Sequence, residues 1–267
     1  MKEDEFKLSE KGGIAIFRQV MDIWIAPEIK RRQNLGEVKS PLILRSAQII
    51  FFPDDERKIQ VRINSEIKGT IKVKFKQGVS KRNGESIFEN EIESIEDFEL
   101  STDDDPDCGH ITLLRINDDW SIYFDFRYNK ALSIKHIGTA EQFYQAAEYS
   151  FSKRNWNSFA DNLFSAAELS VKAQLLLMRD PEFRKKTSHR AIQTKFNKFA
   201  RLGNIRTEHR DTFNKLSGLR DNARYLKSDI QFSEDEARKL LSIVDSMIKE
   251  TKVFSNQSFL SIEPPKN

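Results

Sequence analysis

Residues 155–173 read NWNSFADNLFSAAELSVKA, and this stretch decides the fold of the C-terminal half of the chain. Its large apolar side chains recur three or four residues apart, at Trp156, Phe159 and Leu163, which is the spacing of one helix face. Glu168 and Lys172 lie one turn apart with the acid first, so they are expected to form an ion pair along the helix. The stretch therefore predicts an amphipathic helix that packs against other helices.

The helical pattern extends on both sides of this stretch. The spacing of apolar residues and the turn residues between them predict an antiparallel bundle of five helices, at about residues 139–153, 156–178, 188–202, 207–227 and 233–252. The motifs Thr139-x-x-Gln142 and Ser233-x-x-Glu236 are capping boxes, in which a hydroxyl and a longer polar side chain satisfy free amides at a helix start. They predict where the first and last of these helices begin.

The N-terminal half has a different period. Between residues 42 and 137, apolar and polar side chains alternate, and Asn83-Gly84 is one of the turn signals that separate the alternating runs. This predicts five or six antiparallel strands in a small sheet or open barrel. Residues 14–32 have helical spacing interrupted by Pro27, which is compatible with two short helices or one kinked helix.

The predicted fold class is therefore α+β, with a small antiparallel β domain and a leading helix followed by a five-helix bundle. The expected boundaries are 1–40 for the leading helix and linker, 41–137 for the β domain, 139–252 for the bundle and 253–267 for a tail.

Composition limits the class of protein. The chain has 267 residues, of which 38% are apolar and 32% charged, enough apolar material for folded cores. Its one cysteine, Cys108, excludes an intrachain disulfide. The polar N-terminus lacks the pattern of a signal peptide, and no window is apolar enough to span a bilayer. These features predict a soluble, cytoplasmic protein without a membrane partner.

Charge is unevenly distributed, although the formal net charge is only +3. Residues 85–107 contain 11 acids and no base, while residues 184–227 contain 13 bases and 3 acids. The basic segment is expected to be a phosphate-binding surface, a solvated polar face, or a surface that docks the acidic segment. The candidate nucleic-acid-binding residues are Arg184, Lys185, Lys186, Arg190, Lys195, Lys198, Arg201 and Arg224.

Several kinds of site are excluded by the absence of their motifs. The sequence contains no phosphate-binding Gly-rich loop, nucleophile elbow, His-x-x-x-His pair or cysteine pair, so no cofactor or metal is expected. A cluster of aspartates is interpreted as solvated acid rather than a cation site; it comprises Asp103, Asp104, Asp105 and Asp107.

One strand face offers a second candidate surface for nucleic acid. Lys72, Lys74 and Lys76 alternate along a predicted strand, and aromatic residues follow later in the β region at Trp120, Tyr123 and Tyr128. Such a face could bind single-stranded nucleic acid by stacking and phosphate contacts. The favoured interpretation is a solvated strand face over a Phe-rich core.

The helical half resembles a HEPN domain. The run Ala166-Ala167-Glu168-Leu169-x-Val171-Lys172-Ala173 is similar to the second helix of that family, and Ser188-His189-x-x-Ile192 to the segment after its long loop. Leu219-Arg220-Asp221-Asn222-Ala223-Arg224-Tyr225 resembles the fourth helix, and Ser233-Glu234-Asp235-Glu236-Ala237 the start of the closing one. The resemblance implies an up-and-down bundle that is often dimeric.

The resemblance also implies a chemistry. Many HEPN proteins are metal-independent ribonucleases, with an Arg, a following polar residue and a His four to six residues after the Arg. Arg220 and Asp221 match this signature, but Tyr225 stands where the His is expected, and a phenol is a poor base at neutral pH. The candidate catalytic residues are thus Arg220, Asp221 and Tyr225. In one alternative, a His such as His209 comes from a partner chain to complete the site. In another, Arg220 and Tyr225 are only bundle residues, and Arg220 pairs with a carboxylate such as Glu168.

The resemblance thus favours an RNA- or nucleotide-binding protein, non-catalytic or weakly catalytic, that forms a homodimer. It implies a role in a bacterial stress-response, toxin–antitoxin or phage-defence system. One alternative is a HEPN ribonuclease that uses Arg220 with Tyr225 or a partner-chain His. A second alternative is an interaction subunit that binds a partner protein and no nucleic acid.

Overall fold

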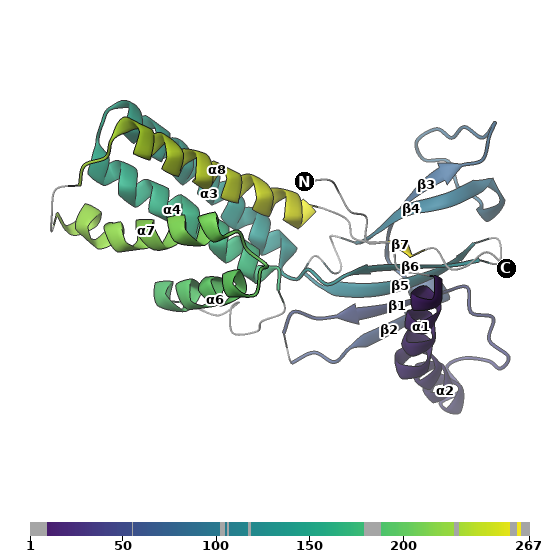
Figure 1. Ribbon diagram of the computed structural model, residues 1–267. Helices are drawn as coiled ribbons and strands as arrows, with labels where there is room; N and C mark the ends of the chain where they lie inside the picture. Colours follow the sequence, from purple (N-terminus) through teal and green to yellow (C-terminus); the bar gives the residue numbers. More distant parts are fainter. Residues whose placement is uncertain are drawn as a thin grey trace. The chain divides into compact units, whose positions relative to one another are not determined.

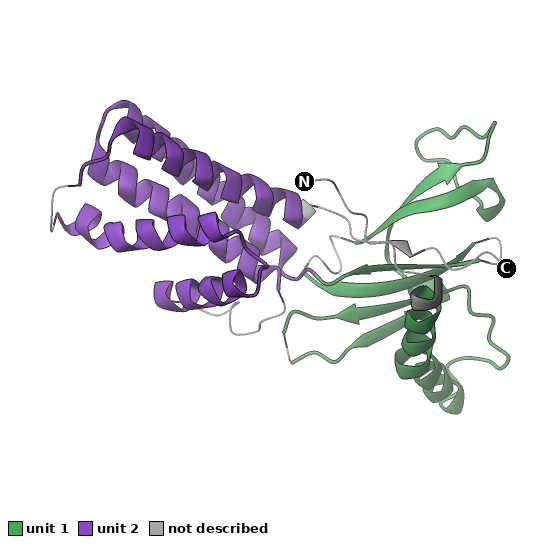
Figure 2. Cartoon of the chain, in the orientation of Figure 1, with its two compact units in different colours: residues 1–126, 258–267 green, residues 127–257 purple. Residues whose placement is uncertain are grey.

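The chain forms two compact units, seen in a computed structural model (Figure 2). One unit comprises Met1–Phe126 with Ser258–Asn267, and the other comprises Arg127–Gln257. The structure describes residues 10–54, 56–101, 105, 107–116, 119–178, 188–226, 230–256 and 261–262. Strands dominate the first unit and helices the second, which confirms the predicted α+β class.

The first unit begins with a helix that changes its hydrogen-bond pattern midway. Helix α1, Glu10–Val20, continues into a π-helical segment, Met21–Ile25, and then into α2, Ala26–Asn34. Pro27 lies just after the π-helical segment, and a local change in hydrogen bonding is a common consequence of the amide hydrogen that a proline lacks inside a helix. Of the two alternatives left open by Pro27, the continuous helix with an internal irregularity is correct.

The strands form a five-stranded sheet and a separate two-stranded ribbon (Figure 1). The sheet has the order β2-β1-β5-β6-β7 and is antiparallel throughout; its strands are β1 (Ser46–Phe51), β2 (Gln60–Ile63), β5 (Gly109–Ile116), β6 (Asp119–Asp125) and β7 (Ser261–Ile262). The ribbon pairs β3 (Gly69–Phe75) with β4 (Ile92–Leu100).

The predicted small antiparallel β domain is therefore confirmed, and two of its strands, β3 and β4, form a ribbon separate from the five-stranded sheet. One apolar cluster packs Val20 and Ile25 of the leading helix against sheet residues such as Ile49. A second cluster packs Phe98 and Leu100 of β4 against other sheet residues, such as Ile50. In β5 the first six residues are all buried, polar His110 and Thr112 among them, so both faces of the strand are covered. Short β7 lies in the stretch expected to be a tail.

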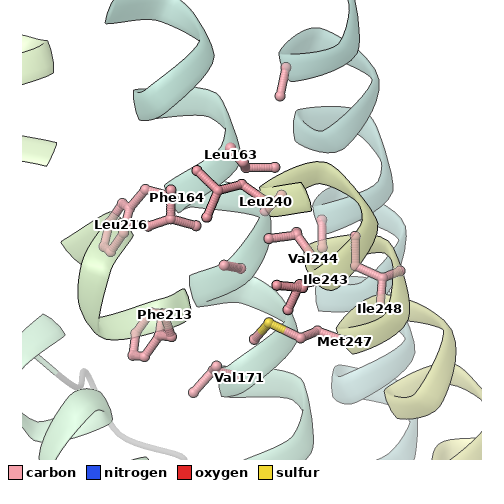
Figure 3. Close-up of a cluster of buried hydrophobic side chains, with 14 of the residues drawn as sticks. Leu163, Phe164, Val171, Phe213, Leu216, Leu240, Ile243, Val244, Met247 and Ile248 are labelled. Atoms are coloured by element: carbon pink, nitrogen blue, oxygen red, sulfur yellow. The ribbon is translucent and has the colours of Figure 1, made fainter. Parts of the chain in front are cut away.

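The helical unit contains α3 (Lys130–Ser152), α4 (Trp156–Leu176), α6 (His189–Arg201), α7 (Thr207–Tyr225) and α8 (Glu234–Asn256). The described helices of this unit agree with the five that the sequence predicts. Phe159, Leu163 and Val171 of the predicted stripe are almost fully buried. Figure 3 shows side chains of α4 meeting those of α7 on one side and α8 on the other, in one continuous apolar core.

Helix α3 begins nine residues before its predicted start. The hydroxyl of Thr139, expected to cap the helix, instead donates within it to the carbonyl of Lys135, at 3.1 Å. Contacts with the C-terminal end of α4 determine where α3 begins. Asn129, with φ 52°, donates its side-chain amide to the carbonyl of Leu176 at 2.9 Å, and the hydroxyl of Ser133 donates to Ala173 at 3.1 Å. These are tertiary contacts, which a local sequence pattern does not reveal.

The second predicted cap is confirmed and supports a test. The backbone amide of Glu236 donates to the hydroxyl oxygen of Ser233 at 3.2 Å, immediately before α8. Ser233→Ala is therefore expected to lower the free energy of unfolding by about 1 kcal/mol, measured by urea denaturation followed by circular dichroism. Thr139→Ala is the matched control, since Thr139 has the same motif but lies inside a helix. An equal loss in both variants would contradict the assignment of the cap.

Candidate nucleic-acid interface

Helix α6 presents a face of positive charge with no acid in its own sequence, HRAIQTKFNKFAR. Ile192, Phe196 and Ala200 are buried and attach the helix to the bundle. On its other faces Arg190, Lys198 and Arg201 are exposed, and within the described part of the chain none of the three forms an ion pair. Their charge is therefore open to solvent or to an anionic ligand.

The pKa of Lys195 is affected by the neighbouring positive charge. Burial of Lys195 lowers the pKa of its ammonium, and the nearby charge of Lys198 lowers that pKa further. We call the exposed cations Arg190, Lys198 and Arg201, together with half-buried Lys195, the α6 basic face.

Most other cations of the basic segment already have carboxylate partners. Arg224, a candidate for nucleic-acid binding, contacts Asp161 at 3.1 Å. Three bases elsewhere on α7 and just before it are also paired: Arg206 with Glu250, Arg210 with Asp211 and Lys215 with Glu236. Candidates Arg184, Lys185 and Lys186 lie outside the described residues. Within the described part of the segment of 13 bases, α6 carries the exposed cations Arg190, Lys198 and Arg201, for which no ion pair is seen.

The basic strand face of the first unit is largely neutralised. Lys72 contacts Glu96 at 3.1 Å and Lys74 contacts Glu93 at 2.8 Å, because β4 supplies acids opposite the lysines of β3. Tyr123 and Tyr128 are buried and offer no exposed ring for stacking. These contacts favour the solvated strand face over the single-strand binding surface.

The acidic segment is not entirely solvated. Asp105, interpreted from the sequence as solvated acid, is buried and accepts a hydrogen bond from Arg62 at 2.8 Å. That interpretation is wrong for Asp105, because the sequence could not show that Arg62 of β2 lies beside it. Asp103 and Asp104 are outside the described residues. Among the described residues, no three His, Cys, Asp or Glu side chains are grouped as metal ligands.

The residues suggested as catalytic lie on α7. Arg220 is half-buried, and its guanidinium carbon lies 5.4 Å from the ring centroid of Phe164 on α4. Asp221 is exposed, and Tyr225 is 63% exposed in the last position of the helix. The structure shows no hydrogen bond between Arg220 and Tyr225 within its described residues.

Glu168 has a different partner from the expected one. It accepts a hydrogen bond from Nδ1 of His189, at the start of α6, rather than pairing with Lys172 along α4. Lys172 instead lies near His136, where its charge adds to the effect of burial and lowers the pKa of that imidazole. No site role was predicted for His189, although it is part of the Ser188-His189-x-x-Ile192 segment.

His189 and Arg220 meet the same aromatic ring. The imidazole of His189 lies 6.2 Å from Phe164, between ring centroids, and Arg220 lies over the same phenyl group. His209, proposed as a histidine from a partner chain, is 6% exposed and hydrogen-bonded to Ser246 at 3.2 Å. Burial lowers the pKa of His209. Its ring is thus largely inaccessible to a second chain.

Two further possibilities are a cysteine nucleophile and a membrane-spanning helix. Cys108 is buried, and burial raises the pKa of its thiol to about 11, so it is not a thiolate nucleophile at neutral pH. Within the described residues, no helix combines the length and the apolar character needed to cross a bilayer.

The C-terminal half thus contains a helical bundle with a basic helix, and a half-buried arginine and an exposed histidine both lie near the ring of Phe164. Residues 135–254 match the family model of the HEPN domain, so this half of the chain is a HEPN domain. The match confirms the resemblance predicted from the sequence, and it includes α6, α7 and nearly all of α3 and α8. A search of curated proteins finds no match to the chain.

Proposed function

We propose that this HEPN domain binds single-stranded RNA through the α6 basic face. The observation that carries the proposal is the combination of Arg190, Lys198 and Arg201 on a helix without acids, exposed and without carboxylate partners in the described chain. Cations that lack a protein partner gain most from phosphates, because binding releases the counterions condensed on RNA. The HEPN match supports a function related to RNA or nucleotides.

The wider setting follows from the family association. We propose a cytoplasmic homodimer in a bacterial stress-response, toxin–antitoxin or phage-defence system. The alternative interaction subunit would dock a partner protein and leave the α6 basic face without a role in RNA binding.

Binding and its salt dependence test the proposal. The triple variant Arg190→Gln, Lys198→Gln, Arg201→Gln is expected to bind a mixed-sequence 30-nucleotide RNA on the order of a hundredfold more weakly at 0.1 M salt. The slope of log K against log salt should fall by about 2, since each lost phosphate contact on a single strand removes about 0.7. Fluorescence anisotropy between 50 and 300 mM salt measures both quantities.

A second triple variant controls for net charge. Arg206→Gln, Arg210→Gln, Lys215→Gln removes the same charge from the same domain, but each of these cations already contacts a carboxylate. It should lose much less affinity and keep most of the salt slope. Equal losses in the two variants would show a nonspecific effect of charge. Absence of RNA binding by the unchanged protein would favour the interaction subunit.

A further inference from the structure

We infer that amide side chains on the seam between α6 and α7 read RNA bases and favour the keto bases, uracil and guanine. This base reading rests on the proposed RNA binding and adds a preference among strands to it. Its basis is a cluster of three carboxamides along the α6 basic face, formed by Gln193 and Asn197 of α6 with Asn214 of α7.

The three carboxamides are joined by hydrogen bonds between the two helices. Asn214 Nδ2 donates to Asn197 Oδ1 at 2.9 Å, and Asn197 Nδ2 donates back to Asn214 Oδ1 at 3.4 Å, so these two amides form a reciprocal pair. Gln193 Nε2 donates to the same oxygen of Asn214 at 2.9 Å. All three residues are partly exposed, so the protein orients their side chains while solvent still reaches them.

The cluster keeps hydrogen-bonding groups free for a ligand. Each amide nitrogen carries two hydrogens and uses one of them within the cluster, so one N–H is left on every member. The carbonyl oxygen of Gln193 accepts no hydrogen bond from the described residues, whereas Asn214 Oδ1 already accepts two. The seam therefore presents three N–H donors beside one unoccupied carbonyl oxygen.

Uracil and guanine match this set of groups better than adenine and cytosine do. A keto base presents a ring N–H beside a carbonyl, so Gln193 can accept from the N–H and donate to the oxygen, in a bidentate pair. The base oxygen has a second lone pair, which can accept a further N–H from the Asn197–Asn214 pair. Adenine and cytosine carry an amino group at that position, and a further donor there would be left without an acceptor.

The charges beside the seam orient the strand. Arg190 precedes Gln193 by three residues and Arg201 follows Asn197 by four, so each arginine neighbours an amide on the surface of α6. The two arginines are 11 residues apart, about 16 Å along the helix axis. On α7 the neighbouring cations already contact carboxylates. Phosphates are therefore held on the α6 side, and the bases face the seam.

Homopolymers that differ only in the base edge test this preference. Uracil and cytosine have the same ring, but uracil has a ring N–H and a carbonyl where cytosine has a bare ring nitrogen and an amino group. A 30-nucleotide oligouridine is expected to bind on the order of tenfold tighter than oligocytidine at 0.1 M salt, measured by fluorescence anisotropy. Alternating adenosine and guanosine should likewise exceed oligoadenosine, and equal binding of these two would contradict the preference for guanine.

Two substitutions at Gln193 separate base reading from phosphate binding. Gln193→Met keeps the side-chain length without its hydrogen bonds, so the affinity for oligouridine should fall to that for oligocytidine while the salt slope stays unchanged. Gln193→Arg keeps donors but has no acceptor, so both strands should bind more tightly and without a preference. Thr194→Val, at the adjacent exposed position of α6, is the control and should keep the preference. Thermal melting verifies that each variant is folded.

Three results would contradict the inference, and only one of them would also contradict the proposed function. RNA binding with equal affinity for oligouridine and oligocytidine would overturn the base reading and leave the α6 basic face as the RNA site. A preference that persists in both Gln193 variants would show that other residues read the base, which also overturns the inference alone. Absence of RNA binding by the unchanged protein would overturn the proposed function and the base reading together.

Discussion

Phe164→Ala is expected to lower the free energy of unfolding of the helical unit by about 3–5 kcal/mol. Phe164 is 2% exposed and stacks on Phe213 at 6.0 Å with an interplanar angle of 7°. Figure 3 shows Phe164 of α4 and Phe213 of α7 among the buried apolar side chains of the helical core. The loss combines transfer of the ring to water with the contacts that its neighbours no longer make.

Urea unfolding followed by circular dichroism at 222 nm measures this effect. Tyr149→Ala is the control, since Tyr149 is an exposed aromatic residue of α3 and its removal should change stability by no more than about 0.5 kcal/mol. Phe164→Leu should retain much of the stability because it keeps most of the apolar volume, yet it removes the ring beneath Arg220 and His189. A Phe164→Ala protein as stable as the Tyr149→Ala protein would contradict the described core.

Arg62→Met is expected to destabilise the sheet unit by a similar amount, about 3–5 kcal/mol. Arg62 and Asp105 have side-chain exposures of 9% and 5%, and their polar atoms lie 2.8 Å apart. Removing the guanidinium leaves a buried carboxylate without its main source of compensation. Arg62 also donates to Gln48 at 3.1 Å, so the substitution disturbs a buried polar network rather than one bond.

The double variant Arg62→Met, Asp105→Leu separates the cost of burying a lone charge from the net effect of the pair. It should recover most of the lost stability, because neither charge is then buried. Arg57→Met is the exposed counterpart: its 2.6 Å contact with Asp54 lies in solvent and should contribute no more than about 1 kcal/mol. Tryptophan fluorescence in a Trp156→Phe background reports unfolding through Trp24 and Trp120 of the sheet unit. Equal effects of Arg62→Met and Arg57→Met would contradict the burial of the first pair.

The predictions from sequence are accurate where the interacting residues are close in sequence, and less accurate where they are far apart. The stripe that includes Phe159 and Leu163 and the cap at Ser233 depend on residues a few positions apart, and the structure confirms both. The start of α3 depends on Asn129 meeting Leu176, which is 47 positions away. A capping motif at Thr139 therefore misled, because nothing local to it indicates that the helix has already begun.

The candidate site shows the same limit. Composition identified a basic segment but could not distinguish Arg224 from Arg201. Arg224 contacts Asp161 of another helix, whereas exposed Arg201 forms no ion pair within the described chain. The pairing of Glu168 with His189 spans 21 positions, so the sequence predicted the nearer Lys172 instead. Residue types on α7 suggested Arg220, but only the structure shows that Arg220 of α7 and His189 of α6 both lie near Phe164 of α4.

Strand β7 makes the helical unit an insertion rather than an appendage. The chain leaves the sheet unit after Phe126, completes the HEPN domain and returns at Ser258, and Ile262 then pairs with Ile122 of β6. Two chain connections therefore join the units, one after Phe126 and one before β7. A single proteolytic cut directly after Phe126 would leave the helical unit attached to the sheet only through the short pairing of β7 with β6.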